Sequence, residues 1–125
     1  MYDTNRKVSM NNRKENSTNN INEIYWKDHC GIAFTLSAIG GRWKINILSY
    51  LLHEGKLRYS ELGKRLVGIS ERMLIAKLKE LEQDRLIDRI VYQQVPPKVE
   101  YELTTLGQSL EKILVLMDEW GETNM

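Results

Sequence analysis

The sequence has few of the residues that build disulfide, metal and catalytic sites. Cys30 is the only cysteine among 125 residues, so an internal disulfide is excluded, and a lone thiol is typical of a reducing cytosol. The two histidines, His29 and His53, fit no ligand spacing pattern for a metal, and no glycine-rich phosphate loop is present. Asp28, His29 and Cys30 are neighbours in sequence, and since neighbours on a helix point about 100° apart, they cannot form a catalytic relay by themselves. We therefore expect no enzyme activity, no cofactor and no metal.

Long apolar stretches are also absent. The longest mostly apolar stretch, residues 31–41, is too short to span a bilayer and is ended by Arg42. The N-terminus has neither the hydrophobic segment nor the cleavage motif of an export signal. With 42% hydrophobic and 28% charged residues, the chain is expected to be a soluble cytoplasmic protein without a membrane partner.

The first 22 residues are poor in apolar side chains and include seven asparagines. Such a segment cannot bury enough surface to offset the entropy lost on ordering. We expect residues 1–22 to be a disordered arm and residues 23–125 to be one folded domain.

The net charge of +1 conceals an uneven distribution of charge. Residues 56–98 have ten Lys or Arg and six Asp or Glu, a net of +4, whereas residues 99–125 have one Lys and six acidic residues, a net of −5. A basic middle and an acidic end indicate that these parts face different surroundings. Ordinary solvated helix faces would give the same pattern, so the architecture has to decide between these readings.

Hydrophobic periodicity predicts five helices and three short strands. The helices are expected over about residues 30–39, 42–53, 60–66, 70–84 and 105–120, and the strands over about residues 57–59, 87–93 and 99–103. A short turn with Gly68 joins two of the helices, and Pro96-Pro97 separates the last two strands. This order predicts a mainly α fold with a small β-wing, namely a winged helix-turn-helix with an extra helix at each end.

Side-chain types indicate helix ends and buried faces. Ser60, Ser70 and either Thr104 or Thr105 are expected N-caps. The buried stripe of the helix over residues 70–84 is expected to be Met73, Leu74, Leu78 and Leu81. The last helix has an apolar stripe wider than one core-facing side needs, consisting of Leu106, Leu110, Ile113, Leu114, Met117 and Trp120. A two-fold dimer would bury the surplus and place two recognition helices about 34–36 Å apart, whereas packing within one chain is the alternative.

The helix over residues 70–84 begins with short or polar side chains that can enter a DNA major groove. The candidates for base readout are Ser70, Arg72, Ile75 and Ala76. Arg72 is suited to two hydrogen bonds with guanine or to a phosphate contact, and Ile75 or Ala76 to a thymine methyl group. The candidates for phosphate contacts are Arg58, Lys64, Arg65, Lys77, Lys79 and Lys98. Lys98 is expected at the wing tip, within reach of an adjacent minor groove or its phosphates. Each of these residues taken alone also fits a solvated surface, and Ser70 also fits a cap without a base contact.

Several motifs occur in order over about residues 28–122. They are Cys30, Gly40-Gly41-Arg42-Trp43-Lys44, Arg58-Tyr59-Ser60-Glu61-Leu62, Gly68-Ile69-Ser70, Met73-Leu74, Leu78-Lys79-Glu80-Leu81-Glu82, Val95-Pro96-Pro97-Lys98-Val99-Glu100-Tyr101, Leu103-Thr104 and Leu106-Gly107. In these the chain resembles the HxlR family of winged helix-turn-helix regulators, within the broader MarR-like group. The Asn-rich arm before Cys30 departs from the short N-terminus usual in that family.

The resemblance implies a homodimeric transcription regulator of inverted-repeat DNA, either an activator or a repressor. It also implies that the first and last helices build the dimer interface. The interface residues then expected are Ile32, Leu36, Leu110, Ile113, Leu114, Met117 and Trp120. In some members of the family a cysteine at the position of Cys30 senses oxidants or electrophiles.

The sequence is compatible with more than one input signal and with more than one kind of partner. A thiol at a helix start, as Cys30 is placed, is favoured as thiolate and is suited to oxidant sensing, but it also fits a small buried hydrophobe in a dimer core. A regulator that binds a small aromatic ligand at the dimer interface is an alternative, with Trp26, Trp43, Tyr50, Met117 and Trp120 as lining residues. A protein-binding winged helix is a third reading, which the basic bias of residues 56–98 disfavours.

Overall fold

A computed structural model describes residues 24–125 of the chain. The expected arm over residues 1–22 lies outside the described residues. The chain divides into two compact units, Met1–Gly40 and Gly41–Met125. Within residues 24–125 no helix is both long enough and apolar enough to cross a membrane.

The described part of the first unit is helical. Residues 24–29 are helical, and α2 follows over Gly31–Ile39. Cys30 lies between them as the N-cap of α2, with an extended backbone. The expected helix over residues 30–39 is therefore confirmed, and it begins one residue later than expected.

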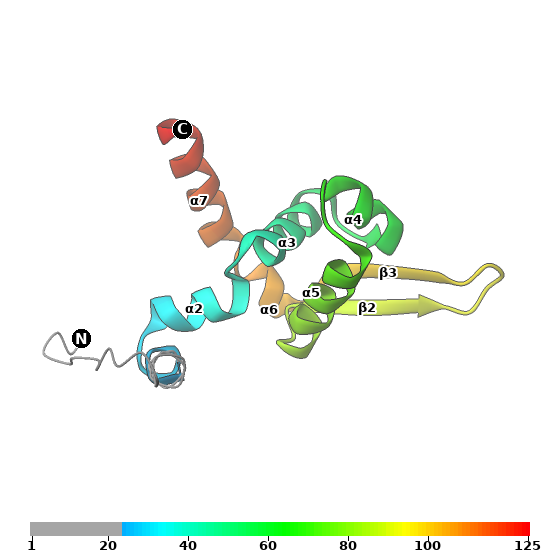
Figure 1. The fold of residues 1–125 in the computed structure, drawn as a ribbon, viewed down its shortest axis with the longest axis horizontal. Coiled ribbons are helices and arrows are strands. Elements are labelled where there is room, and N and C mark those ends of the chain that lie inside the picture. The colour runs from blue at the N-terminus through cyan, green and yellow to red at the C-terminus, as the bar shows by residue number, and fades with distance from the viewer. Residues whose placement is uncertain (1–23) are drawn as a thin grey trace, which may run out of the picture. The chain divides into compact units, whose positions relative to one another are not determined.

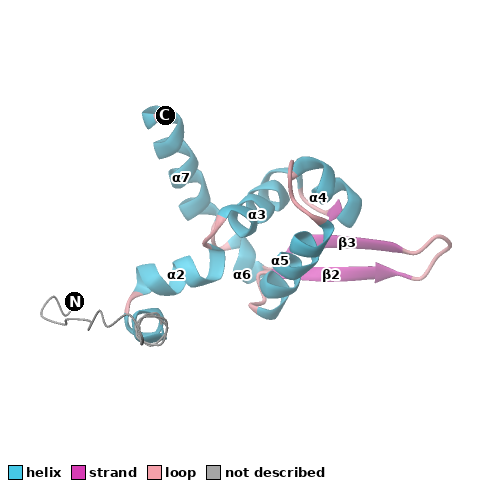
Figure 2. Ribbon diagram, in the orientation of Figure 1, coloured by secondary structure: helices cyan, strands magenta, loops and turns pink. Residues whose placement is uncertain are grey.

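The second unit contains the winged helix-turn-helix. Its elements are α3 (Arg42–Glu54), β1 (Leu57–Arg58), α4 (Tyr59–Arg65), α5 (Glu71–Gln83), β2 (Ile87–Tyr92), β3 (Lys98–Leu103), α6 (Thr105–Gln108) and α7 (Glu111–Asn124). Figure 1 shows α4 and α5 beside the start of the β2–β3 hairpin, which extends beyond the helices. The helical content and the small sheet are apparent in Figure 2. The predicted fold class is confirmed.

The three strands form one antiparallel sheet in the order β1-β3-β2. Strands β2 and β3 pair from Ile87 opposite Leu103 to Tyr92 opposite Lys98. The short strand β1 pairs Leu57 with Tyr101. Because Leu57, Ile87, Tyr101 and Leu103 are all buried, the inner end of the sheet is anchored in the core while the outer end of the hairpin projects as the wing.

Leucines and isoleucines from α3, α4, α5 and the sheet form the core. Helix α5 buries Leu74, Leu78 and Leu81, which recur at a spacing of four and three residues on one face. The prediction that Met73 belongs to this stripe is wrong, because 39% of Met73 is exposed. Met73 precedes Leu74 by one residue, so it points about 100° away from the buried face.

Two helix ends differ from the predictions. Ser60 is not the N-cap of α4, because the helix begins one residue earlier and Arg58 occupies the cap position. The Arg58 backbone N–H donates to the Glu61 carboxylate at 2.8 Å, so an acidic side chain in the first turn satisfies a backbone donor at the start of the helix. By contrast, the Ser70 hydroxyl does accept from the Met73 N–H at 3.1 Å and caps α5 as predicted.

The single helix predicted over residues 105–120 is wrong, because the segment is broken into α6 and α7. Thr104 caps α6, its hydroxyl oxygen accepting from the Gly107 N–H at 3.0 Å. The backbone then tightens, since the N–H groups of Ser109 and Leu110 each donate to the carbonyl three residues earlier, both at 3.1 Å. The chain is thereby redirected before α7 begins at Glu111.

Candidate nucleic-acid interface

The turn between α4 and α5 fixes where the second helix begins. Gly68 has φ of +91°, a left-handed conformation that glycine adopts readily. The Ile69 N–H donates to the Leu66 carbonyl at 3.0 Å, and Ser70 then caps α5. These contacts hold the N-terminus of α5 at the molecular surface.

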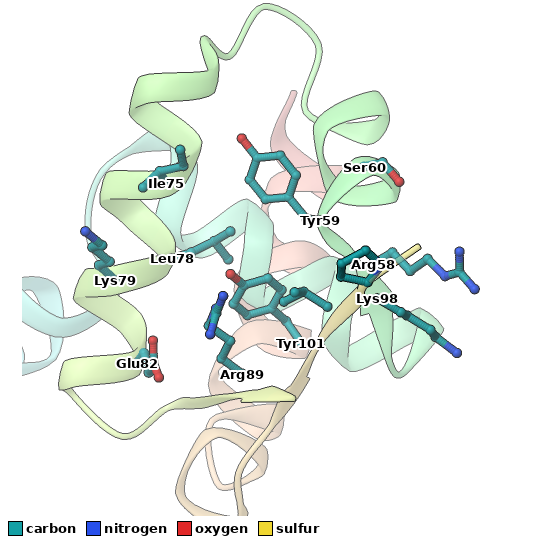
Figure 3. A pocket seen from close by; sticks show the side chains of 12 residues that line it. Arg58, Tyr59, Ser60, Ile75, Leu78, Lys79, Glu82, Arg89, Lys98 and Tyr101 are labelled. Atoms are coloured by element: carbon teal, nitrogen blue, oxygen red, sulfur yellow. The ribbon is translucent and has the colours of Figure 1, made fainter. Parts of the chain in front are cut away.

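The residues predicted to read bases share one exposed region at the start of α5. Ser70, Arg72, Ile75 and Ala76 are all exposed, whereas the buried stripe of α5 faces the core. Ile75 and Lys79, labelled on α5 in Figure 3, line a groove together with residues of the wing and of the start of α4. The Ser70 hydroxyl serves as a cap, so any base contact it makes is shared with that role.

A groove of about 660 Å³ lies between α5, the start of α4 and the wing. Its basic lining residues are Arg58, Lys79, Arg89 and Lys98, and its acidic lining residue is Glu82. In Figure 3 the side chain of Arg89 lies between α5 and the sheet and that of Lys79 lies along α5, whereas those of Arg58 and Lys98 extend away from α5. The groove therefore combines an excess of positive charge with the exposed face of α5.

Arg89 was not among the residues chosen from the sequence. It lies on β2, directly opposite Tyr101 of β3. The register of the hairpin brings it to the face that α5 covers. The alternation of side chains along β2 could have shown that Arg89 shares a face with its second neighbours on the strand. Which face of the sheet that is depends on the pairing with β3, and the local sequence does not determine this pairing.

The six predicted phosphate contacts have different surroundings. Arg58, Lys64 and Lys79 are exposed. The Lys77 ammonium lies 3.1 Å from the Glu80 carboxylate, in the same helix. Lys98 is not at the wing tip, because it forms the last pair of the β2–β3 ladder with Tyr92. Its ammonium lies 4.7 Å from the centre of the Tyr92 ring and 3.7 Å from the Glu100 carboxylate.

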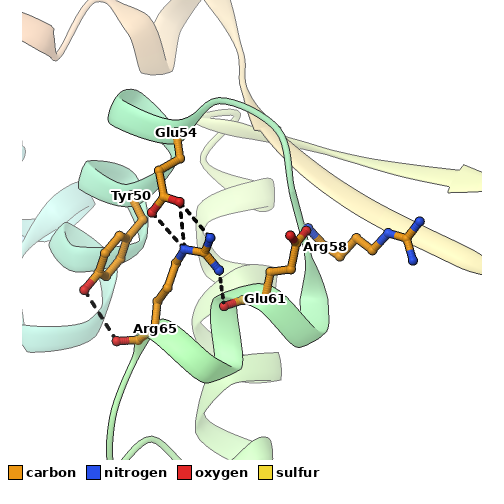
Figure 4. Close-up of polar contacts among 5 residues, drawn as sticks. All are labelled: Tyr50, Glu54, Arg58, Glu61 and Arg65. Atoms are coloured by element: carbon orange, nitrogen blue, oxygen red, sulfur yellow. Dashed lines mark hydrogen bonds and ion pairs between the residues drawn. The ribbon is translucent and has the colours of Figure 1, made fainter.

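Arg65 is held by other protein groups (Figure 4). Its guanidinium donates to both carboxylate oxygens of Glu54 at 2.7–2.9 Å and to the Glu61 carbonyl at 3.0 Å. The Tyr50 hydroxyl donates to the Arg65 carbonyl at 3.4 Å. We call Glu54, Arg65, Tyr50 and Glu61 the α3–α4 clamp, because these contacts join the end of α3 to the end of α4.

The clamp changes the titration of its charged members. Hydrogen bonding to Arg65 holds the pKa of Glu54 below its usual value, and the attraction of the guanidinium acts in the same direction. The same hydrogen bond raises the pKa of Arg65. Arg65 is therefore already paired with an anion within the chain.

We predict that Glu54→Gln lowers the free energy of unfolding at neutral pH. Because the pKa of Glu54 is lowered in the folded state, its contribution is present above the unfolded pKa and is lost as pH falls through the folded pKa. The stability difference between wild type and variant should thus shrink in acid, as measured by urea unfolding at several pH values. The control is Glu119→Gln on α7, which should show little difference at any pH. A Glu54→Gln difference that persists unchanged in acid would contradict the prediction.

The comparisons with known proteins agree with this geometry. Residues 38–125 match the model of the HxlR-like helix-turn-helix family. The chain belongs to this family. YybR, an HTH-type transcriptional regulator of Bacillus subtilis (strain 168), is 50% identical over 98 residues, 78% of each chain. The described fold and this kinship make the chain a helix-turn-helix transcriptional regulator.

Solved structures of related regulators are similar to this HxlR-like protein. The redox regulator HypR in its oxidized form has 48% sequence identity and a TM-score of 0.72, covering 77% of this chain and 98% of that chain. The reduced form of the transcriptional regulator YodB from B. subtilis has 32% identity and a TM-score of 0.64, covering 76% of this chain and 93% of that one.

Two helices of this HxlR-like protein have unusually apolar exposed faces. On α2, Ile32 and Leu36 are 65% and 57% exposed, and on α7, Trp120 is 71% exposed. Ile113 and Met117 are also exposed, whereas Leu110 is half-buried. Leu114 is buried within its own chain. Packing of Trp120 and Met117 into the core of one chain, the alternative raised by the sequence, therefore does not occur among the described residues.

Cys30 lies in the first unit, between the helical residues 24–29 and α2. It is half-buried and borders a shallow hollow of about 450 Å³ lined by residues 27–31 and Phe34. The neighbouring His29 stacks on Tyr25, with ring centres 4.3 Å apart. Among residues 24–125, no group of three or more His, Cys, Asp or Glu is placed to hold a metal ion.

Proposed function

We propose that this regulator is a homodimer that binds inverted-repeat operator DNA and responds to oxidants or electrophiles through Cys30. The observation that carries the DNA-binding proposal is the exposed start of α5, with Arg72, Ile75 and Ala76, beside a groove with four basic residues. Helix α5 would enter the major groove and read base edges, while lysines and arginines around it bind phosphates.

The dimer is supported by the exposed apolar faces of α2 and α7. Soluble monomers rarely leave the apolar face of a helix exposed in this way, and a two-fold interface would bury the same face on both copies. Such a dimer presents two α5 helices to two half-sites of an inverted repeat. Sedimentation of the protein and in vitro selection of bound DNA test this together: a dimer and a palindromic consensus are expected, and a monomer without sequence preference would refute it.

We predict that Lys98→Ala weakens binding to all DNA sequences alike. The Lys98 side chain is 24% exposed, and among residues 24–125 its ammonium has a 3.7 Å ion pair with Glu100 and a contact with the Tyr92 ring, so it can turn to a phosphate. Losing one phosphate contact should lower the slope of log K against log salt by about one unit. Lys112→Ala on α7 is the matched control and should leave the slope unchanged. An unaltered slope for Lys98→Ala would exclude this contact.

The oxidant response is supported by the family and by the position of Cys30. HypR is described as a redox regulator, and YodB has been solved in a diamide-treated form. A Cys30 thiolate that attacks a peroxide takes one oxygen to become a sulfenic acid, and the leaving oxygen departs as hydroxide. The sulfenic acid can then condense with a second thiol to a disulfide and release water.

We predict that Cys30→Ser binds operator DNA as wild type does under reducing conditions but no longer responds to peroxide. The serine hydroxyl is nearly the same size as the thiol, and it is not oxidised under these conditions. Gel-shift titrations with and without peroxide measure the difference, which should be large for wild type and absent for the variant. Release of DNA from the variant by peroxide would overturn Cys30 as the sensor. A Cys30-independent response to an aromatic compound would instead support ligand sensing.

A further inference from the structure

The tip of the wing has no charged residue. The β2–β3 ladder ends where Tyr92 pairs with Lys98, and the five residues between them are Gln93, Gln94, Val95, Pro96 and Pro97. All five are exposed, and Val95 is 99% exposed. Figure 1 shows this loop as the end of the hairpin, beyond the helices of the second unit.

The positive charge of the wing lies closer to its base. The Lys98 side chain lies over the Tyr92 ring and beside Glu100, and Arg89 is further along β2 toward the core. A DNA contact made by the tip therefore gains little from phosphate attraction. Whatever the tip contributes must come from hydrogen bonds and van der Waals contact.

The side chains at the tip suit the edges of base pairs in a minor groove. There A·T and T·A pairs present only acceptors, whereas G·C adds the guanine amino group. Amide side chains can donate to those acceptors, and apolar side chains contact the groove floor where no amino group projects. The side chains of Gln93 and Gln94 are exposed, and the Gln94 backbone N–H donates to the Tyr92 carbonyl at 3.1 Å. The two side chains are therefore free to make such contacts.

The tip is also continuous with the surface proposed for DNA. Pro97 lines the same groove as Ile75 and Lys79 of α5. DNA that receives α5 in its major groove would continue along this surface, so the adjoining minor groove is the part that meets the end of the hairpin.

We propose that residues 93–97 read the minor groove flanking each α5 contact and favour A·T over G·C there, through Gln93, Gln94 and Val95 and without a phosphate contact. This inference rests on the proposed DNA-binding function. The base of the wing would then contribute affinity for DNA, and its tip would contribute sequence discrimination.

The test uses the full-length protein and operator duplexes that differ only in the flanking pairs. One duplex has A·T there, one G·C and one inosine·cytosine, which lacks the guanine amino group and so resembles A·T in the minor groove and G·C in the major groove. Wild type should bind the A·T and inosine·cytosine duplexes on the order of tenfold more tightly than the G·C duplex. An inosine·cytosine duplex that behaves as G·C, or an absence of any preference, would overturn the proposal.

The variant combines Gln93→Ala, Gln94→Ala and Val95→Ala. It should bind all three flanks within about twofold of one another while its salt slope stays at the wild-type value. Lys98→Ala is the matched control, expected to keep the flank preference and to lose about one unit of slope. Since the three side chains are exposed, urea unfolding should be unchanged, which separates loss of readout from loss of fold. A variant that retains the preference refutes the tip as reader, whereas wild-type protein without salt-dependent DNA binding would refute the proposed function itself.

Discussion

Arg72→Ala is expected to lower the affinity for operator DNA by roughly 1–3 kcal/mol and to relax the preference at one base pair. Arg72 is the second residue of α5, its side chain is exposed, and within residues 24–125 it has no ion pair or hydrogen bond from its side chain. The guanidinium is therefore available for two hydrogen bonds to guanine O6 and N7. Binding titrations against operators with each base at each position would locate the pair that it reads.

The control for Arg72 keeps the charge and changes the geometry. Arg72→Lys retains one positive charge but lacks the planar fork that bonds guanine at two points. We expect it to lose the base preference while non-specific binding and the salt slope stay near the wild-type values. Equal weakening on every sequence, with a slope lower by about one unit, would instead show that Arg72 contacts a phosphate. Unchanged affinity in both variants would reject the placement of the contact surface.

Local sequence signals were sufficient for most elements of the fold. The cap at Ser70, the turn at Gly68 and the period of Leu74, Leu78 and Leu81 are all decided within a few residues of one another. The strands of the wing follow equally from alternation and from Pro96-Pro97. For these features, the local backbone preference and the burial of one face favour the same structure.

The sequence was insufficient where a residue's position depends on strand register or on a partner that is distant in the sequence. Lys98 was expected at the tip, but hairpin register places it in the ladder opposite Tyr92. Arg65 was chosen as a phosphate contact, a prediction that stays untested, and nothing in the sequence indicated its partner Glu54, which lies 11 residues earlier on another helix. Neither relation can be read from periodicity, because both depend on how elements pack after they form.

The break between α6 and α7 also depends on a contact with a residue far away in the sequence. The pattern of Leu106, Leu110 and Leu114 is compatible with one continuous helix. The structure instead packs Gly107 of α6 against the backbone just before β2: a Cβ at this position would lie 2.2 Å from the Leu86 carbonyl oxygen and 3.2 Å from Leu103 Cδ2. That same carbonyl accepts the Thr104 N–H at 3.1 Å, so α6 is fixed closely to the start of the wing.

Gly107→Ala is expected to destabilise the protein by about 1–3 kcal/mol or more, because the new methyl group meets backbone that must move apart. Gly63→Ala is the matched control within α4: its Cβ would lie 3.6 Å from Leu74 Cδ2, an ordinary contact, and alanine in a helix interior should stabilise by roughly 0.5–1 kcal/mol. The same substitution at two buried or half-buried helical glycines should therefore change the free energy of unfolding with opposite signs, as measured by equilibrium urea unfolding. If Gly107→Ala were as stable as wild type, α6 would not approach Leu86 as closely as described, and the cause given for the broken helix would have to be abandoned.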